Sequence, residues 1–307
     1  MRARSAVVIG GTGSLGRHIC AALLRDGAYR VTAVARHEAP VVPGARLLTA
    51  DLLGDDDRAV SRLVAGSDVV INAAGAGWSG TAEHMARAHT VLVDRLLRLL
   101  PAHTRLVHLG SVHEYGEIRP HDAADERHPE RPSTVYGRTK LTGTRSVLAS
   151  AAEGRTDGVV LRVTNVCGPG APAASFLGSL IQRLRHLSPG SLLDLALTPD
   201  ARDFVDIRDV ADAAVRAATA PVTGLVINVG RGAVHDVRTA AELVIDAAGF
   251  PRDRVRMRGA AVAGSAGGHG AWTKVDVRRA RDLLGWTHST SLRDSLRHQW
   301  EWEAAAP

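Results

Sequence analysis

The sequence predicts an α/β fold, built as a doubly wound parallel sheet with a smaller C-terminal domain. Short apolar runs alternate with longer helical patterns up to about residue 165, and the alternation then becomes less regular. A glycine-rich loop between Gly10 and Gly16 joins the first apolar run to the first helical pattern. Ligands of such sheets bind at the carboxyl ends of the strands, so we expect the site residues to follow the apolar runs.

The apolar runs and the helical patterns give an expected order of elements. Short runs favour buried strands, expected at residues 6–10, 30–35, 47–50, 69–72, 105–109, 159–163 and 225–229. Stretches rich in alanine and leucine favour helices, expected from the glycine loop to about residue 26, at 81–100, around Tyr136, at 176–187, at 239–248 and from about 292. Residues 202–210 are expected to run from a strand into a helix.

Composition favours a globular cytoplasmic protein. Hydrophobic residues make up 45% of the 307 residues and charged residues 23%, and no apolar run reaches the ~20 residues of a membrane span. The N-terminus leads directly into a strand and resembles no signal peptide. The two cysteines are far apart in sequence and suggest no disulfide framework. We therefore expect a cytoplasmic location and no membrane partner.

The chain is basic, with a net charge of +6, but its basic residues form no dense run. Lys140 and Lys274 are the only lysines among 38 basic residues, and the arginines are scattered along the sequence. A nucleic-acid site normally shows clustered basic residues, so nucleic acid is not an expected partner. The positive charge instead favours attraction of a small anionic substrate.

The loop with Gly10, Gly13 and Gly16 has the spacing of a dinucleotide-binding turn. Glycines at these positions allow a tight turn, close approach of a pyrophosphate and close packing of helix on strand. The following helix would face the phosphates with free N–H groups. Arg36 ends the second expected strand, where an acidic residue would favour NAD, and its charge suits the 2′-phosphate of NADP. An ordinary surface arginine is the alternative for Arg36.

Tyr136 and Lys140 form a Tyr-x-x-x-Lys pair in an expected helix. A spacing of four residues places both side chains on one helix face. An ammonium beside a phenol favours the phenolate, so we expect Lys140 to lower the pKa of Tyr136 from about 10. Such a tyrosine can donate or accept a proton at a carbonyl or alcohol oxygen. An ordinary exposed helix is the alternative, which the surrounding motifs disfavour.

These stretches together resemble the extended short-chain dehydrogenase/reductase family, which contains nucleotide-sugar epimerases, dehydratases and ketoreductases. The matching motifs follow one another in the family's order: Gly10 to Gly16, Asp51-Leu52, Ser111 with Tyr115-Gly116, Tyr136 with Lys140, Leu161 to Asn165, Gly168 to Gly170, Arg202 to Phe204, Asp209-Val210 and Leu284 to Trp286. The resemblance implies a Rossmann-like doubly wound parallel sheet, formed by residues 1–165 and 203–230. It also implies a substrate-binding domain of residues 166–202 and 231–307, and a homodimer.

The resemblance assigns roles to individual residues. Tyr136 would exchange a proton with the substrate oxygen, Ser111 would hold the same oxygen, and Lys140 would hold the nicotinamide ribose. Asn165 and Arg202 stand where sugar-nucleotide members contact the diphosphate of the substrate. The implied cofactor contacts are Gly10, Thr12, Gly13, Ser14, Leu15, Gly16, Arg36, Asp51, Leu52, Ala73, Ala74, Tyr136, Lys140 and Val163. The expected cofactor is NADP(H), with NAD as the alternative.

Some positions depart from the family pattern. Val112-His113 replaces the Asp-Glu acid and base of the 4,6-dehydratases, so dehydration is not expected. His113 could act as an acid or base near neutral pH, or it could hold the loop or contact the sugar. Thr90 stands where an asparagine is usual. Residues 259–270 have no clear counterpart, so the nucleotide base of the substrate is not predicted.

The leading hypothesis is an NADPH-dependent ketoreductase acting on a nucleoside-diphosphate-linked keto-(deoxy)sugar, with Tyr136 as general acid. The first alternative is an epimerase that retains its NAD and returns the hydride. Further alternatives are a reductase of a non-sugar ketone and a non-catalytic NADP sensor, although sensors tend to lose the tyrosine and lysine kept here. No metal is expected, because His121, Asp122, Asp125 and His128 fit no metal-ligand spacing.

Overall fold

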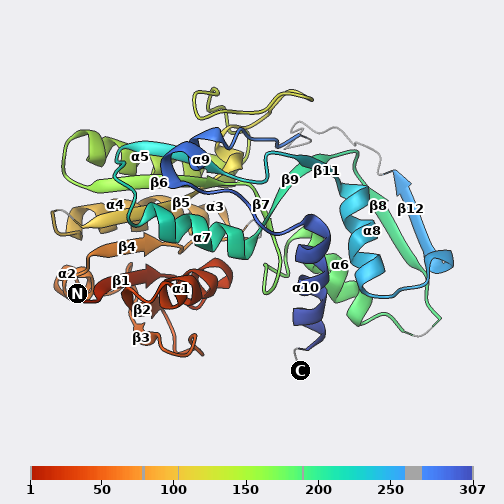
Figure 1. The fold of residues 1–307 in the computed structure, drawn as a ribbon, viewed down its shortest axis with the longest axis horizontal. Coiled ribbons are helices and arrows are strands. Elements are labelled where there is room, and N and C mark those ends of the chain that lie inside the picture. Colours follow the sequence, from red (N-terminus) through yellow and green to blue (C-terminus); the bar gives the residue numbers. More distant parts are fainter. Residues whose placement is uncertain (1, 78–79, 103, 189, 260–271, 306–307) are drawn as a thin grey trace.

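The computed structural model describes residues 2–77, 80–102, 104–188, 190–259 and 272–305. Figure 1 shows a larger part, which contains the central sheet, beside a smaller part made of helices and short strands. The N-terminus begins in the larger part, and the last helix lies in the smaller one. The chain therefore passes between the two parts more than once, as the interrupted pattern of its second half indicates.

A seven-stranded sheet forms the centre of the larger part, and all its neighbouring strands are parallel. The strands are β1 (Arg4–Ile9), β2 (Tyr29–Ala35), β3 (Arg46–Thr49), β4 (Val69–Asn72), β5 (Arg105–Ser111), β6 (Asp157–Val163) and β10 (Leu225–Val229). Their order is β10-β6-β5-β4-β1-β2-β3, so the direction of winding reverses between β1 and β4. The predicted fold class is confirmed, and ligands of such sheets bind near this reversal.

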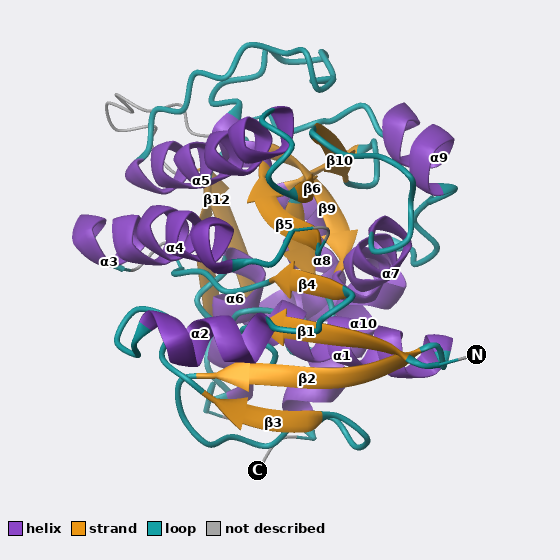
Figure 2. Ribbon diagram, turned by 90° about the vertical axis from the view of Figure 1, so that its left-hand side faces the viewer, coloured by secondary structure: helices purple, strands orange, loops and turns teal. Residues whose placement is uncertain are grey.

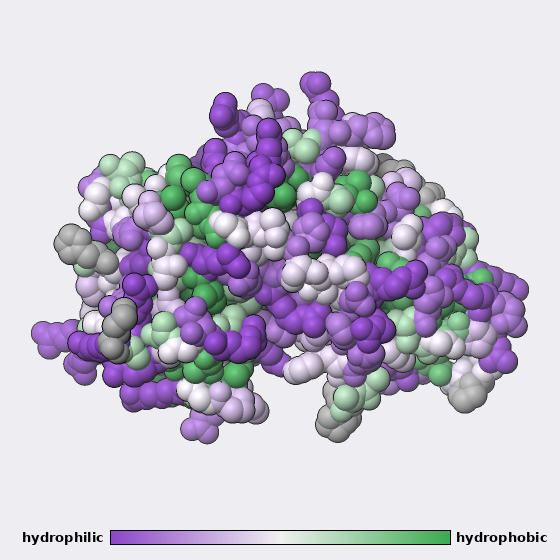
Figure 3. All heavy atoms as spheres, in the orientation of Figure 1, coloured by the Kyte–Doolittle hydropathy of each residue, from purple (hydrophilic) through white to green (hydrophobic). Residues whose placement is uncertain are grey.

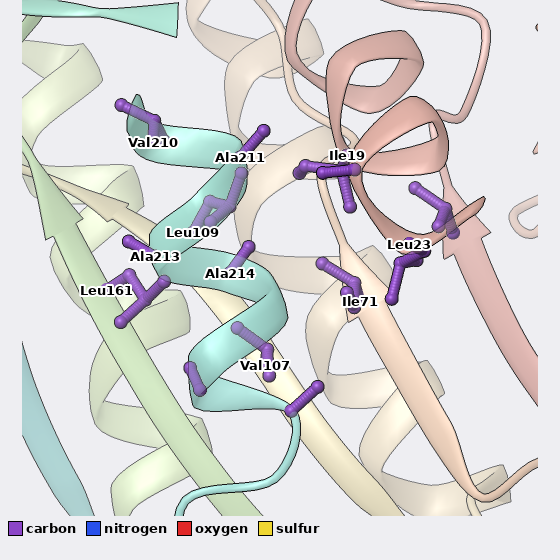
Figure 4. Packing of buried hydrophobic residues seen from close by; sticks show 14 of the residues in the cluster. Ile19, Leu23, Ile71, Val107, Leu109, Leu161, Val210, Ala211, Ala213 and Ala214 are labelled. Atoms are coloured by element: carbon purple, nitrogen blue, oxygen red, sulfur yellow. The ribbon is translucent and has the colours of Figure 1, made fainter. Parts of the chain in front are cut away.

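Helices cover both faces of the sheet (Figure 2). One face packs against α1 (Ser14–Asp26), α7 (Ile207–Ala217) and α9 (Arg278–Leu284), and the other against α2 (Asp57–Val64), α4 (Leu92–Leu99) and α5 (Val135–Ala152). Neighbouring strand residues point to opposite faces, so Val8 belongs to the first core and Val7 to the second. Figure 4 shows the first core, where Ile19 of α1 faces Ala211 of α7. Burial of both faces explains why the strands appear in the sequence as continuous apolar runs.

The predicted helix over residues 81–100 is divided into three pieces. A π-helical turn, η1 (Arg87–Val91), separates α3 (Ala82–Ala86) from α4. The backbone packs tightly against α5 at this turn, since a Cβ on Gly143 would lie 2.2 Å from the His89 carbonyl oxygen. The wider turn therefore occurs where this helix meets α5, and a periodic pattern alone does not reveal it.

The smaller part has a core of its own. Its elements are β7 (Asn165–Cys167), α6 (Phe176–Arg185), β8 (Leu193–Leu197), β9 (Ala201–Asp206), β11 (Val234–Asp236), α8 (Val237–Ala247), a short turn η3 (Arg252–Arg254), β12 (Val255–Gly259) and α10 (Leu292–Ala304). Strand β9 lies between β7 and β11, and β8 pairs with β12. Ile181, Val244 and Leu296 are buried together and join the three helices. The predicted domain boundaries stay a prediction.

The surface mixes hydrophilic and hydrophobic residues on the face that Figure 3 shows. None of the helices in the described ranges is long and apolar enough to cross a membrane. The glycine-rich segment that lacked a counterpart in the family, residues 259–270, lies outside the described residues except for Gly259, which ends β12.

Candidate active site

The catalytic candidates meet where α5 passes the carboxyl end of β5. Ser111 is the last residue of β5, and a 3₁₀ turn, η2 (Val112–Glu114), follows directly. Helix α5 begins after Thr134, whose side chain caps it by accepting a hydrogen bond from a first-turn amide. This start places Tyr136 in the first turn of the helix and Lys140 in the second.

Ser111 is fixed by the turn that it caps. Its hydroxyl accepts a hydrogen bond from the His113 amide at 3.4 Å, and its own amide donates to Glu114 Oε1 at 2.7 Å. The turn lies against α5, since a Cβ on Gly137 would come within 2.4 Å of the His113 carbonyl oxygen. The buried Ser111 side chain also hydrogen bonds with Tyr136. The two hydroxyl groups can therefore act on a single substrate oxygen.

Tyr136 is surrounded by histidine rings and has a perturbed pKa. Its ring packs edge to face against His89, with 5.3 Å between centroids, and against His113, with 6.0 Å. Burial raises the pKa of Tyr136 to about 12; the hydrogen bond with Ser111 opposes this, and the charge of Glu114 adds to it. A phenol with this pKa keeps its proton at neutral pH and can donate it to an oxygen that becomes negatively charged.

Lys140 is buried one helical turn further along α5. Its ammonium donates a hydrogen bond to the Leu109 carbonyl oxygen at 2.6 Å. Burial lowers the pKa of Lys140, and the negative charge of Glu114 opposes this shift. The prediction that Lys140 lowers the pKa of Tyr136 is wrong, because loss of hydration around the phenol dominates. The four-residue spacing predicts where Tyr136 and Lys140 lie, whereas their burial determines how their pKa values shift.

The glycine loop after β1 is shaped by close contacts. Gly10 has a left-handed φ of 75°, and a Cβ there would lie 2.9 Å from Ala74. A Cβ on Gly16 would lie 2.0 Å from the Gly10 carbonyl oxygen, so α1 can approach the loop only with glycine at this position. Helix α1 begins at Ser14 and has no acidic residue in its first turn, while Leu15 packs on the first core. The helix end thus offers free N–H groups and positive potential to a phosphate.

A cavity of about 310 Å³ opens beside this loop. Most of the predicted cofactor contacts line it, namely Gly10, Thr12, Gly13, Arg36, Asp51, Leu52, Ala73 and Ala74. His84 and Arg87 also line it, from α3 and η1, and no motif in the sequence predicted them. The side chains of Arg36 and Arg87 are exposed, and together they make the cavity positively charged. Val163, at the end of β6, is buried in the first core and is not part of the cavity lining.

The candidates on the substrate side, Asn165 and Arg202, lie on the paired strands β7 and β9. The Asn165 side-chain amide donates to the Asp203 carbonyl oxygen at 3.0 Å and to the Thr273 hydroxyl at 2.9 Å. Arg202 pairs with Asp200 at 2.8 Å, and its Nε is buried without a hydrogen-bond partner among the described residues. Asn165 therefore ties β7 to β9 and to the distant Thr273, whereas Arg202 retains an unused donor.

His89 is a site residue that motif reasoning missed. Its buried ring accepts a hydrogen bond from the Ala76 amide at 3.0 Å and bonds with the Thr139 hydroxyl at 2.9 Å. Burial lowers the pKa of His89 to about 3, so the ring is neutral. Thr90, expected at the position of the usual asparagine, has a hydroxyl 3.5 Å from the Thr139 carbonyl oxygen. The shorter polar contact with α5 therefore comes from His89, the residue before Thr90. A histidine within the apolar pattern of an expected helix is the sequence signal that could have indicated this contact.

The loop that contains His121 and Asp122 is attached to the segment from Trp272 to Lys274, which is distant in the sequence. The His121 ring lies 5.1 Å from the Trp272 ring, and the Trp272 indole donates to the Asp122 carbonyl oxygen at 2.6 Å. The Ala124 amide likewise donates to the Lys274 carbonyl oxygen at 3.0 Å. Within the described ranges, no three His, Cys, Asp or Glu side chains are grouped so that they could hold a metal ion.

The fold and the site define a class of protein. A doubly wound sheet, a glycine turn beside a cavity, and a Ser, Tyr and Lys set at the end of β5 are the marks of an extended short-chain dehydrogenase/reductase. The sequence matches the NAD dependent epimerase/dehydratase family over residues 6–230, and the chain belongs to this family. It is therefore an enzyme of the oxidoreductase and epimerase kind.

Three known proteins illustrate the relationship. The chain is 37% identical to dTDP-6-deoxy-L-talose 4-dehydrogenase (NAD(P)(+)) of Kitasatospora kifunensis over 308 residues, which cover 98% of this chain and 96% of that protein. It is 30% identical to dTDP-L-rhamnose 4-epimerase of Burkholderia thailandensis over 192 residues, 59% of this chain and 49% of that protein. It is similar to the structure of MoeE5 in complex with UDP-glucuronic acid and NAD, with a TM-score of 0.81, 26% identity, and coverage of 98% and 99%.

Proposed function

We propose that the protein is an NADPH-dependent ketoreductase acting on the 4-keto group of a nucleoside-diphosphate-linked 6-deoxy sugar. The observation that carries the proposal is the arrangement at the end of β5, where Ser111 ends the strand and the first two turns of α5 place Tyr136 and a buried Lys140 against it. The relative from K. kifunensis supports the reaction type over nearly its full length, because dehydrogenation at C4 is the reverse of 4-keto reduction. Its name also supports a dTDP-linked substrate.

The residues of the cavity fit a dinucleotide cofactor. Gly10 and Gly16 leave no room for a side chain, so the backbone itself can approach a pyrophosphate at the start of α1. Arg36 and Arg87 would hold a 2′-phosphate from two sides of the cavity, which favours NADPH over NADH. When bound, this cofactor supplies the hydride for the carbonyl carbon.

The chain's own residues would bind and protonate the sugar. Ser111 would donate a hydrogen bond to the keto oxygen and fix its position. Tyr136 would give its proton to the same oxygen as negative charge develops there. Lys140 would supply positive charge below this pair, and Arg202 would bind the diphosphate, because a planar guanidinium can bond two phosphate oxygens.

Epimerisation with retained NAD is the second candidate function. His113 favours it, because this half-buried ring lies 6.0 Å from the Tyr136 ring and an imidazole can serve as an acid or a base. An acid or base next to Tyr136 could invert a carbon beside the keto group. The relative from B. thailandensis, a 4-epimerase, matches only part of this chain.

The decisive experiment supplies NADPH and a dTDP-4-keto-6-deoxy sugar to the purified protein and follows the loss of NADPH absorbance. We expect one NADPH consumed per sugar reduced, and exchangeable cofactor when the purified protein is analysed by mass spectrometry. Tightly bound NAD with isomerised sugar and no net NADPH consumption would refute the reductase and support the epimerase. Turnover of simple cyclic ketones, with none of the nucleotide sugar, would refute the substrate class.

A further inference from the structure

A fully buried ion pair lies beside the Ser111 turn. Glu114 Oε2 and Arg162 Nη2 are 2.8 Å apart, and both side chains are 0% exposed. Arg162 also pairs with Glu130 at 2.6 Å, and its guanidinium stacks 4.3 Å above the Tyr115 ring. Apolar side chains of similar volume usually stabilise a core as well as such a pair does, since removing two charges from water is costly. Stability alone therefore does not explain why the Glu114–Arg162 pair is buried at this place.

The Glu114 carboxylate reaches the backbone of the catalytic strand. Its Oε1 accepts the Ser111 amide at 2.7 Å, while its Oε2 bonds to Arg162. Glycine at position 110 makes room for it, because a Cβ there would lie 2.7 Å from Glu114 Oε1. One carboxylate thus links the end of β5 to the buried guanidinium, and it holds the turn that presents the Ser111 hydroxyl.

Glu114 and Lys140 both bond to the end of β5, since Glu114 Oε1 accepts the Ser111 amide at 2.7 Å and Lys140 Nζ donates to the Leu109 carbonyl oxygen at 2.6 Å. The ammonium is buried against the Leu109 carbonyl oxygen, where burial lowers its pKa and the charge of Glu114 opposes the change. The other titratable groups around it are His89 and His108, whose pKa values burial lowers, and Tyr136 on the same helix. All three are neutral at pH 7, so they cannot offset the cost of a buried positive charge.

We propose that Glu114 is a positioning residue of the active site, which holds Ser111 in place and keeps Lys140 charged in a buried position. Arg162 has a supporting role, because it fixes the carboxylate that performs both tasks. Glu114 would not touch the substrate and would act on the reaction only through Ser111, Lys140 and the nearby Tyr136. The proposal rests on the proposed function in one respect, namely that Ser111 and Lys140 serve the reaction.

The small number of lysines makes the charge of Lys140 directly measurable. In protein labelled with ¹³C-lysine, only Lys140 and Lys274 contribute side-chain signals, and their pKa values can be followed by NMR without any substrate. In Glu114→Gln we expect the Lys140 titration to move to lower pH, while Lys274 stays unchanged. Glu130→Gln is the matched control, because it removes the other carboxylate from the same guanidinium and should leave Lys140 unchanged.

Turnover gives a second readout. We expect Glu114→Gln to lower kcat by up to about 10²-fold with KM for the sugar nucleotide little changed, since misplaced catalytic groups lose rate more than binding. In the pH profile of kcat, the alkaline limb of this variant should move to lower pH, because the charge of Glu114 raises the pKa of both Lys140 and Tyr136. Loss of stability alone would lower the melting temperature without moving this limb.

Identical Lys140 titrations in wild type, Glu114→Gln and Glu130→Gln would overturn the proposal. If Glu114→Gln does not fold, Glu114→Gln with Arg162→Gln removes both buried charges, and a smaller shift of the Lys140 titration to lower pH is expected, because loss of the Arg162 charge offsets part of the effect. A shifted Lys140 in a protein that turns over no nucleotide sugar supports the electrostatic half of the proposal and refutes the proposed function instead. An unshifted Lys140 in an active reductase refutes only the role of Glu114.

Discussion

The proposed cofactor side and the proposed substrate side of the candidate site differ in how many of their polar groups are already hydrogen-bonded within the protein. On the cofactor side, the glycine turn and Arg36 border a cavity of about 310 Å³. On the substrate side, Asn165 and Arg202 are bonded to neighbouring residues of the protein itself. Both sets were predicted from motifs of similar clarity. A motif therefore predicts where a side chain lies better than it predicts what that side chain is free to bind.

The physical reason lies in the range of the interactions. The cofactor turn is defined by steric contacts within a short segment and with Ala74, so its glycines determine its shape. Asn165 instead bonds to Thr273, more than 100 residues away, and this partner cannot be recognised from either motif. Tyr136 and Lys140 fall between these extremes, because their relative position follows from local spacing and their pKa shifts follow from burial.

The largest expected effect is that of Tyr136→Phe, which removes only the hydroxyl between the two sides. We expect turnover to fall by roughly 10²–10⁴-fold, the usual value of a positioned general acid, with cofactor affinity unchanged. Tyr29→Phe is the control, since its buried hydroxyl has no hydrogen-bond partner among the described residues. Steady-state kinetics and a cofactor titration check this. Retention of more than about a third of wild-type turnover would assign the proton to another group.

On the cofactor side, Arg36→Asp should reverse much of the preference for NADPH. It replaces an attractive charge with a repulsive one, and a single charge-assisted hydrogen bond is worth roughly 1.5–3 kcal/mol, so we expect up to about 10²-fold weaker NADPH binding. NADH affinity should change little. Arg87→Ala sharpens the test, because a smaller loss of the same selectivity would show that both cavity arginines contact the phosphate. Equal loss of NADH and NADPH binding would mean general damage to the cavity.

On the substrate side, Arg202→Ala should have the smallest effect, roughly tenfold weaker dTDP binding with NADPH affinity nearly unchanged. The expected loss is modest because Asp200 already shares the guanidinium. Asp200→Asn should have the opposite effect and tighten dTDP binding, since it removes the charge that pairs with Arg202. Arg183→Ala, on the surface of α6, is the matched control. Calorimetric titration checks this. Equal dTDP affinities in the wild type and in all three variants would mean that Arg202 does not bind the substrate.

The sequence predicts the elements of the fold better than the contacts of the site. All seven strands of the central sheet were predicted within two residues at each end, because burial on both faces leaves a strong apolar signal. The π-helical turn at His89 was missed, since it depends on how closely α5 approaches. Arg87 was missed for a similar reason, because nothing in a surface arginine shows that it borders the same cavity as Arg36.

The sequence by itself determined the doubly wound sheet, the glycine turn and the shared helix face of Tyr136 and Lys140. These features depend on apolar periodicity, on steric limits at glycine and on the repeat of a helix, all of which act over a few residues. Only the tertiary structure decided the protonation of the site. The raised pKa of Tyr136 and the Glu114–Arg162 pair arise from burial among residues from β5, β6, η1 and α5, and hydration is lost only when these elements pack together.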